Sequence, residues 1–202
     1  MYYALGVVRS LALLLVIVGV ANADKPDDFV DVSALVPDAV LDLRYATDHN
    51  FTKVKLYPEA HCKLRRAVAG KLVAAAKALR AQDRRLVIWD CYRPTSIQQK
   101  LWKLVPDERY VANPKKGSNH GRGAAIDVGL VAKDGHAVVL PTDFDDFTVA
   151  AHRDHALKGE RGAEARRLEK AMEDAGWKGM PTEWWHFDDA GATTYPLSDD
   201  PL

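Results

Sequence analysis

The sequence predicts an α+β fold: a single compact domain with a small, mostly antiparallel sheet and flanking helices. Segments of strand and helix character are mixed along the 202 residues without a regular βαβ alternation. The chain shows no internal repeat and no low-complexity segment. No linker-like stretch divides it, so we expect no domain boundary after the N-terminal segment.

Five elements are expected in the first half of the chain. Residues 24–36 form a lead-in, and the partial alternation of apolar and polar residues over 40–45 predicts a short strand. Apolar residues recur at helical spacing over 64–81, which predicts a long amphipathic helix. A strand over 85–89 and a helix over 95–104, with proline just before its first turn, follow.

The second half is expected to contain three strands, a turn and a helix. Residues 124–131 read as a strand, and Asp134-Gly135 is a two-residue turn signal that leads into 137–140. Residues 162–175 carry apolar side chains near one side and form the second long helix, which a glycine ends. A final strand is expected over 184–187.

The first 23 residues have the features of a secretory signal peptide. Arg9 is their only charged side chain, an apolar run extends from Leu11 to Val20, and residues 21–23 offer a small-x-small cleavage site. That run is well short of the ~20 residues needed to span a bilayer, which favours cleavage over the alternative of a retained anchor. We therefore expect residues 24–202 to form the domain of a periplasmic or secreted protein without a stable membrane anchor.

The charge balance bears on the expected binding partners, and the cysteine content bears on an expected disulfide. Loss of residues 1–23 leaves 27 basic and 28 acidic residues, and no polybasic run stands out, so nucleic acid is not an expected partner. Cys62 and Cys91 are an even pair in an exported chain, for which a disulfide is the natural expectation. Two buried free thiols remain the alternative. Zinc ligation by these cysteines is disfavoured because CxxC spacing is absent.

Residues 118–127 contain a histidine and an aspartate, His120 and Asp127, seven positions apart with two glycines between them. Glycine permits a tight turn, so a loop that leads into a strand could bring both side chains to one point. Taken alone, the segment fits equally well a histidine that caps a turn and an ordinary carboxylate at a strand edge.

Residues 183–186 favour a metal site over these alternatives, because they add Glu183 and His186 on either side of two tryptophans. The alternative is a core strand with packing tryptophans, which does not explain the glutamate and the histidine. His120, Asp127 and His186 would supply the three N or O ligands of a catalytic zinc site on the sheet, whose fourth position goes to water. Glu183 would then be the general base. Residues 183 and 186 of an ideal strand point to opposite faces, so we expect Glu183 in a bend just before the strand.

Arg93 is the third candidate, because it follows an apolar strand at a point where a cation could meet the oxyanion formed on an attacked carbonyl. The alternative is a surface ion pair between Arg93 and Asp90, worth under ~1 kcal/mol. The residues alone leave this choice open.

In combination and order, these motifs resemble the D-alanyl-D-alanine dipeptidases of the VanX type, within the zinc D,D-peptidases that share SxHxxGxAxD and ExWH. The resemblance runs through most of the chain after residue 23, from residues 42–47 and 50–52 to residues 183–186. Each short piece is weak alone, whereas their joint presence and order are specific. Asn119 departs from the pattern, since a second serine often stands there in these dipeptidases.

The resemblance implies one zinc ion per chain, bound by His120, Asp127 and His186, with Glu183 as the base and Arg93 stabilising the transition state. It also implies substrate contacts, of which the aspartate in the loop is ambiguous because Asp143 and Asp146 lie nearby. These contacts are Tyr45, Asp90, Ser118 and Asp145.

The function that the resemblance implies is hydrolysis of D-Ala-D-Ala, a dipeptide with free termini, by an exported zinc metallopeptidase. Two alternatives stay open: a D,D-carboxypeptidase or L,D-peptidase that acts on cell-wall peptides, and a non-catalytic, zinc-stabilised domain that binds the wall. The signal segment and the cysteine pair set the chain apart from the cytoplasmic resistance enzymes, which favours wall turnover or nutrient scavenging.

Overall fold

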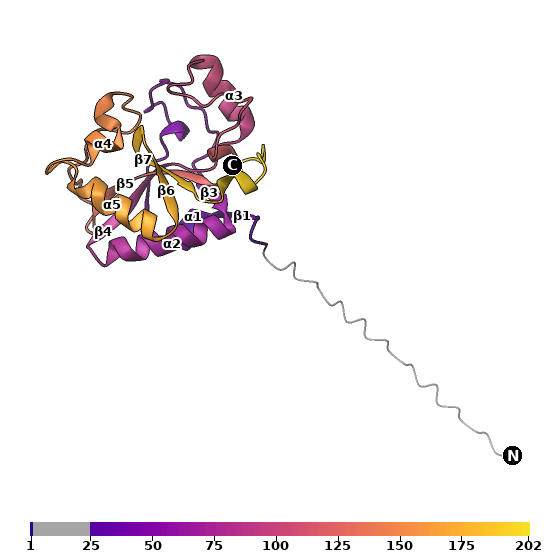
Figure 1. Cartoon of the computed structure of the whole chain (residues 1–202). Coiled ribbons are helices and arrows are strands. Elements are labelled where there is room, and N and C mark those ends of the chain that lie inside the picture. The colour runs from indigo at the N-terminus through magenta and orange to yellow at the C-terminus, as the bar shows by residue number, and fades with distance from the viewer. Residues whose placement is uncertain (2–24) are drawn as a thin grey trace.

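The computed structural model describes Met1 and residues 25–202, so the expected signal segment and its cleavage site fall almost entirely outside the described residues. A five-stranded sheet with the order β2–β4–β5–β7–β6 forms the centre (Figure 1). Strands β2 and β4 are parallel, and the other neighbours are antiparallel. The strands are β2 Val40–Leu41, β4 Arg84–Asp90, β5 Ala125–Ala132, β6 Trp177–Met180 and β7 Glu183–Asp189. A separate two-stranded sheet pairs β1 Phe29–Asp31 with β3 Lys63–Arg65.

Two long helices, α2 and α5, lie side by side against the sheet (Figure 1). Each buries one apolar stripe, which includes Leu72 and Leu79 in α2 and Leu168 and Met172 in α5. Their amphipathic pattern therefore places the main core between these two helices and the sheet. The helices are α1 Val32–Leu35, α2 Arg66–Arg80, α3 Thr95–Leu104, α4 Arg153–Ala156 and α5 Ala163–Asp174; the 3₁₀ turns are η1 Arg44–Ala46, η2 His120–Arg122, η3 Val149–Ala151 and η4 Ala192–Thr194.

The α+β class with a mostly antiparallel sheet is confirmed. Helix α3 has the expected bounds, and α5 differs from its expected range by one residue at each end. Strands β4, β5 and β7 occur where strands were expected, each slightly displaced or extended.

Several expected elements were wrong in extent or kind. The strand expected over 40–45 ends at Leu41, because residues 44–46 turn into η1. The helix expected from residue 64 begins at Arg66, since residues 63–65 pair with β1. Residues 137–140 form no strand, and only an isolated bridge joins Ala137 to Val131. The lead-in over 24–36 contains β1 and α1, and β6 was not predicted.

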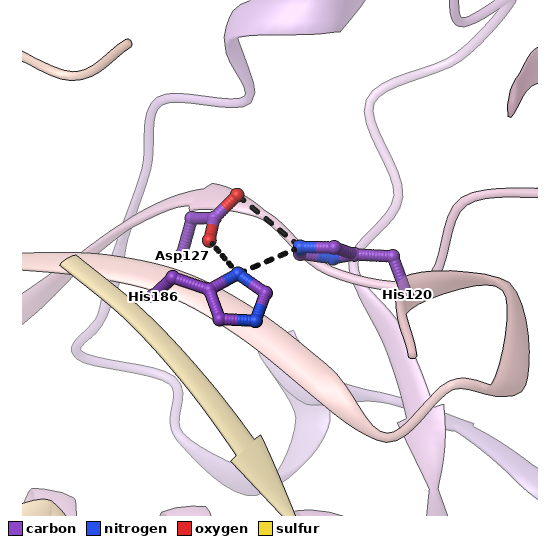
Figure 2. Close-up of side chains that lie close together, drawn as sticks. All are labelled: His120, Asp127 and His186. Atoms are coloured by element: carbon purple, nitrogen blue, oxygen red, sulfur yellow. Dashed lines mark hydrogen bonds and ion pairs between the residues drawn. The ribbon is translucent and has the colours of Figure 1, made fainter. Parts of the chain in front are cut away.

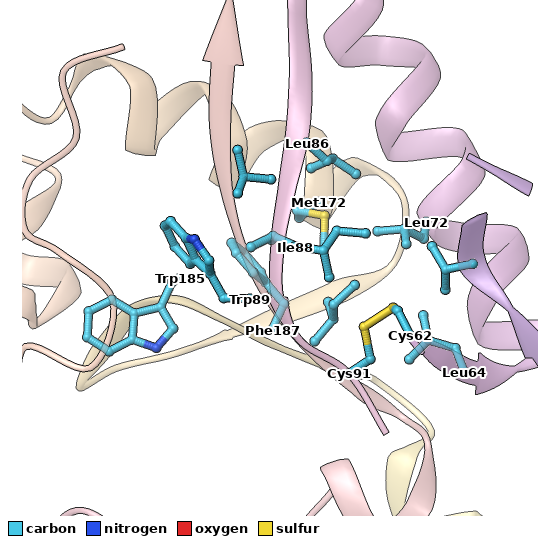
Figure 3. Packing of buried hydrophobic residues seen from close by; sticks show 14 of the residues in the cluster. Cys62, Leu64, Leu72, Leu86, Ile88, Trp89, Cys91, Met172, Trp185 and Phe187 are labelled. Carbon is cyan, nitrogen blue, oxygen red and sulfur yellow. A yellow bond between two sulfur atoms is a disulfide. The ribbon is translucent and has the colours of Figure 1, made fainter. Parts of the chain in front are cut away.

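The structure joins Cys62 and Cys91 in a disulfide (Figure 3). Both cysteines are buried, and Figure 3 places the disulfide beside Leu64 in the hydrophobic core. The bond ties the residue before β3 to the residue after β4. No helix among residues 25–202 is long and apolar enough to cross a membrane.

Replacing both cysteines by alanine should lower the stability of the domain. The disulfide closes a loop with a sequence separation of 29 residues. The chain-entropy model gives a stabilisation of about 3.5 kcal/mol for a loop of roughly 30 residues. The measurement is urea unfolding of the Cys62→Ala, Cys91→Ala double variant against the oxidised wild type. An unchanged unfolding midpoint would contradict the prediction.

Candidate active site

The pairing of β5 with β7 brings together two of the three expected ligands. Asp127 of β5 lies directly opposite His186 of β7 in an antiparallel register. Directly opposite side chains of neighbouring strands stand on one face of the sheet with their Cβ atoms about 5 Å apart. Residues 59 positions apart in the chain therefore meet without any special loop.

The third residue, His120, comes from η2, which immediately precedes β5. Gly123 ends this turn in the left-handed conformation, with φ 67°, and its N–H bonds to the His120 carbonyl. A Cβ at Gly123 would lie 2.3 Å from the ring of Phe29. Glycine is thus required both for the turn and for this close approach, as the two-glycine motif suggested.

Figure 2 shows the resulting cluster. Nδ1 of His186 lies 2.9 Å from Oδ1 of Asp127, Nε2 of His120 lies 3.4 Å from Oδ2 of Asp127, and the two ring nitrogens are 3.3 Å apart. Each of the three buried residues offers one ligand atom, and these atoms all lie within 4.8 Å of one another. Among the described residues, this is the one group of histidine, cysteine and acidic side chains that is arranged to hold a metal ion.

In each of the two histidine rings, the nitrogen that does not face the cluster, here called the outer nitrogen, has its own hydrogen-bond partner. Nδ1 of His120 lies 2.6 Å from the carbonyl oxygen of Cys91, and Nε2 of His186 lies 3.0 Å from Oδ1 of Asp188. Donation to these acceptors leaves the lone pairs of the inner nitrogens facing each other and Asp127, and they repel unless a cation lies between them. Histidine ligands of metals are usually held by such outer hydrogen bonds. The donor set therefore fits a divalent metal of the zinc type.

Glu183 stands beside this cluster, with Oε2 3.9 Å from Nδ1 of His186. It is the first residue of β7 and does not lie in a bend before the strand, so that expectation was wrong. Residues 183 and 186 of a regular strand would point to opposite faces, and an irregularity in the pairing of β6 with β7 removes this conflict. Gly179 of β6 pairs with Phe187, but the next residue, Met180, pairs with Glu183. Residues 184–186 thus have no partner on β6, and this bulge lets residues 183 and 186 approach the same site.

Burial raises the pKa of Glu183 above its usual value, and the charge of Asp127 adds to this effect. Asp127 itself is held ionised, because the two neighbouring histidines lower its pKa in spite of its burial. Glu183 makes none of the short contacts that join the three cluster residues. It is therefore a basic group that remains available for proton transfer.

Arg93 and Asp90 form a buried ion pair, with Nη2 of Arg93 2.5 Å from Oδ2 of Asp90 and side-chain exposures of 8% and 0%. The alternative of a surface pair was wrong. Asp90 also accepts hydrogen bonds from the Tyr57 hydroxyl and the backbone N–H of Cys91, and Arg93 Nη1 donates to Gln98. Asp90 is not part of the cavity wall, whereas Arg93 is. These bonds use three of the five guanidinium N–H groups, and the guanidinium also interacts with the Tyr57 hydroxyl.

A cavity of about 150 Å³ joins these groups. Tyr45, Ser118 and Asp145 line it together with Arg93, Glu183 and the three cluster residues. Its outer wall comes from the segment after α3, which includes Glu108, Arg109 and Tyr110.

Asp145 is the aspartate of its loop that faces this cavity; Asp143 and Asp146 do not line it. The Tyr45 hydroxyl donates to Oδ2 of Asp145 over 3.0 Å, and Asp145 adopts a positive φ of 56°. Burial and the charge of Asp127 raise the pKa of Asp145 well above its usual value. The hydroxyl of Ser118 accepts a bond from the backbone N–H of His120, which leaves its own hydrogen free to donate.

Sequence reasoning missed two partners of the site. Asp188 follows His186 by two positions in β7, so strand alternation alone would have placed both on one face. Gln98 lies one helical turn after the start of α3 and gave no local signal, since only the fold brings it to Arg93.

Two histidines and a carboxylate that converge at a cavity beside a free carboxylate are typical of metal-dependent hydrolases. Comparison with known proteins narrows this class. Residues 25–200 match the family model described as D-ala-D-ala dipeptidase. The chain belongs to this family, so the resemblance drawn from the motifs is confirmed and the protein is a member of a family of peptidase enzymes.

Two relatives are D-alanyl-D-alanine dipeptidases. That of Escherichia coli K12 is 34% identical over 171 residues, covering 84% of this chain and 89% of the relative. That of Enterococcus faecalis V583 is 33% identical over 170 residues, covering 72% and 83%. Similar solved structures include VanYB in complex with D-Ala-D-Ala, which is 17% identical with a TM-score of 0.46. The match covers 68% of this chain and 77% of VanYB. The D,D-dipeptidase VanXYg with a phosphinate analogue has 21% identity, TM-score 0.43, and coverage of 83% and 69%.

The bond from His186 to Asp188 predicts a specific effect on metal binding. In Asp188→Asn, the new amide can donate to Nε2 of His186, which would move the ring proton to Nδ1 and block the inner lone pair. Loss of such an outer partner typically weakens metal affinity by about 10–100-fold. Competition between the protein and a chromophoric chelator for zinc measures this change. The control is Asp174→Asn, which removes an exposed carboxylate of α5 paired with Lys170; equal affinities of the two variants would refute the role of Asp188.

Proposed function

We propose that the protein is an exported, zinc-dependent dipeptidase that hydrolyses D-Ala-D-Ala with free termini. The observation that carries this proposal is the convergence of the His120, Asp127 and His186 ligand atoms beside the free carboxylate of Glu183 in one cavity. Two nitrogen ligands and one oxygen ligand are a common set for catalytic zinc. The names of the relatives support the substrate.

Zinc bound by these three residues, one ion per chain, would lower the pKa of a water molecule and polarise the scissile carbonyl. Glu183 takes the proton from the attacking water, whose oxygen bonds to the carbonyl carbon. The same carboxyl group then returns the proton to the departing nitrogen as the C–N bond breaks. The products are an amine and a carboxylic acid, and transfer of the second proton of the water converts them to an ammonium and a carboxylate. The pKa of Glu183, raised by burial, suits a group that must both accept and release a proton.

Arg93 is assigned to the negative charge that develops on the carbonyl oxygen. Its guanidinium lines the cavity, and Asp90 and Gln98 hold it in place. Donors that are held in place before the reaction need no reorganisation in the transition state. We therefore assign Asp90 to the positioning of Arg93, in place of the direct substrate contact that the resemblance implied.

The two ends of the dipeptide have complementary groups in the cavity. We assign its ammonium to Asp145, which the Tyr45 hydroxyl orients, and its carboxylate to the hydroxyl of Ser118. The cavity of about 150 Å³ is smaller than the ~300–1,000 Å³ pockets that hold drug-sized ligands, which favours a small substrate.

Export is part of the proposal. The segment 1–23 has the features of a cleaved signal, and the buried Cys62–Cys91 disulfide suits an oxidising compartment such as the periplasm or the extracellular space. An enzyme in that location would meet dipeptides released during turnover of the cell wall.

The proposed substrate can be tested with a panel of peptides on zinc-loaded protein. D-Ala-D-Ala should be hydrolysed. N-acetyl-D-Ala-D-Ala should not, because Asp145 requires a free ammonium, and the L,L stereoisomer should not, because the relatives are named for the D,D dipeptide. A chelator should abolish the activity, and added zinc should restore it. Release of free D-alanine is the measured quantity.

The same panel separates the alternatives. Faster cleavage of an N-acylated tripeptide than of the free dipeptide would identify a carboxypeptidase of wall peptides and overturn the dipeptidase assignment. Binding of wall fragments without hydrolysis of any peptide would identify a non-catalytic domain.

Glu183→Gln should remove activity and leave the metal site intact. The amide keeps the shape of the side chain but cannot accept the proton of water, and loss of a general base typically costs about 10²–10⁴-fold in rate. Zinc content after dialysis and kcat are measured together. His120→Ala is the contrasting variant and should lose zinc. Persistent turnover in Glu183→Gln would remove Glu183 from the role of base.

A further inference from the structure

Arg153, at the start of α4, is a buried arginine that no part of the mechanism above uses; only 9% of its surface is exposed. Its Nε donates to the carbonyl oxygen of Met180 and its Nη2 to the carbonyl oxygen of His186, both over 2.8 Å. Its backbone N–H donates to the carbonyl of Pro181. One side chain therefore joins the end of β6 to the middle of β7.

These contacts span the bulge that defines the site. Residues 184–186 have no partner on β6, and Met180 and His186 mark the two ends of this irregular stretch. Buried backbone carbonyls need hydrogen-bond donors, and a bulge removes those that a regular ladder would supply. The planar guanidinium supplies two donors in a fixed fork, which a lysine ammonium cannot reproduce.

Neighbouring residues hold the guanidinium of Arg153 in its position against β6. A Cβ at Gly179 would lie 2.2 Å from Cζ of Arg153, so glycine is what allows the guanidinium to lie against β6. Nη1 pairs with Glu169 of α5 over 3.0 Å, and Cζ lies 4.4 Å from the centre of the Phe187 ring. Strand, helix and aromatic ring thus fix the side chain from three sides.

We propose that Arg153 is a positioning residue of the active site: it holds the β6–β7 bulge and so directs His186 towards the metal and Glu183 towards the water. This inference rests on the proposed function. Arg153 touches neither substrate nor metal, and acts through the backbone carbonyls at both ends of the bulge. Without it, β7 can pair more regularly with β6, which would turn Glu183 and His186 to opposite faces.

The first test is zinc binding by metal-free protein, measured by competition with a chromophoric chelator. Arg153→Met keeps the bulk and removes the donors, and should weaken zinc binding by about 10–100-fold, the usual effect of losing a partner outside the ligand shell. Gly179→Ala leaves Arg153 in the chain but occupies its place, and should weaken zinc binding in the same direction. Arg153→Lys should recover only part of the affinity, because an ammonium on a flexible stem lacks the fixed fork that spaces the two donors for the two carbonyls.

Two control variants separate positioning from general stability. Arg166→Met removes an arginine that also donates to two backbone carbonyls, those of Leu157 and Gly159, on an exposed part of α5 outside the cavity wall. Leu168→Ala destabilises the core under the same helix. Both should retain wild-type zinc affinity at temperatures where they are folded. Kinetics on D-Ala-D-Ala should show a loss in kcat, with little change in KM, for Arg153→Met and not for these two controls.

A folded Arg153→Met protein with wild-type zinc affinity and wild-type kcat would overturn the proposal. Equal losses of zinc affinity in Arg153→Met and in an equally destabilised Leu168→Ala would overturn it as well, as would full recovery with lysine. If the wild type does not hydrolyse D-Ala-D-Ala, the proposed function fails, but the zinc titration still decides whether Arg153 positions the metal site.

Discussion

The antiparallel pairing of β5 with β7 is the constraint on which the site depends. It sets Asp127 opposite His186, and every other functional group is placed relative to that pair. A shift of one residue in this register would move the side chains of one strand to the other face and separate the ligands. The apolar residues that alternate with them, including Ile126 and Phe187, are completely buried, so the hydrophobic core fixes the register that the chemistry needs.

The end of β4 links stability to the geometry of the site. Within two consecutive residues, the carboxylate of Asp90 holds Arg93, the carbonyl of Cys91 accepts from His120, and the sulfur of Cys91 is bonded to Cys62. A disulfide mainly restricts the unfolded chain, but here it also anchors the backbone that orients His120, one of the three candidate metal ligands. The position of the ring of His120 therefore depends on a covalent bond as well as on hydrogen bonds.

The sequence predicted the parts of this site whose signals are local. The two glycines near His120, the helical spacing in α2 and α5, and the spacing of Glu183 and His186 are all readable within a few residues. Contacts between distant segments could not be predicted from such local patterns. The bulge that reconciles Glu183 with His186 depends on the pairing with β6, a short strand that gave no alternation signal. The role of Arg153 could not be predicted either. Its partners are backbone carbonyls, which every residue carries, so no residue type marks these contacts in the sequence.

The charges around the cavity give a physical reason for the proposed preference for a free dipeptide. Asp127, Asp145 and Glu183 line it, whereas the one buried guanidinium in its wall, Arg93, is already paired with Asp90. Burying carboxylates in excess costs free energy, and the raised pKa values of Asp145 and Glu183 are the expression of that cost. A divalent cation together with a free ammonium group removes the excess, whereas an acylated peptide brings no charge to Asp145. Under the proposed function, the excess of buried carboxylates that disfavours folding would therefore favour a substrate with an unblocked amino terminus.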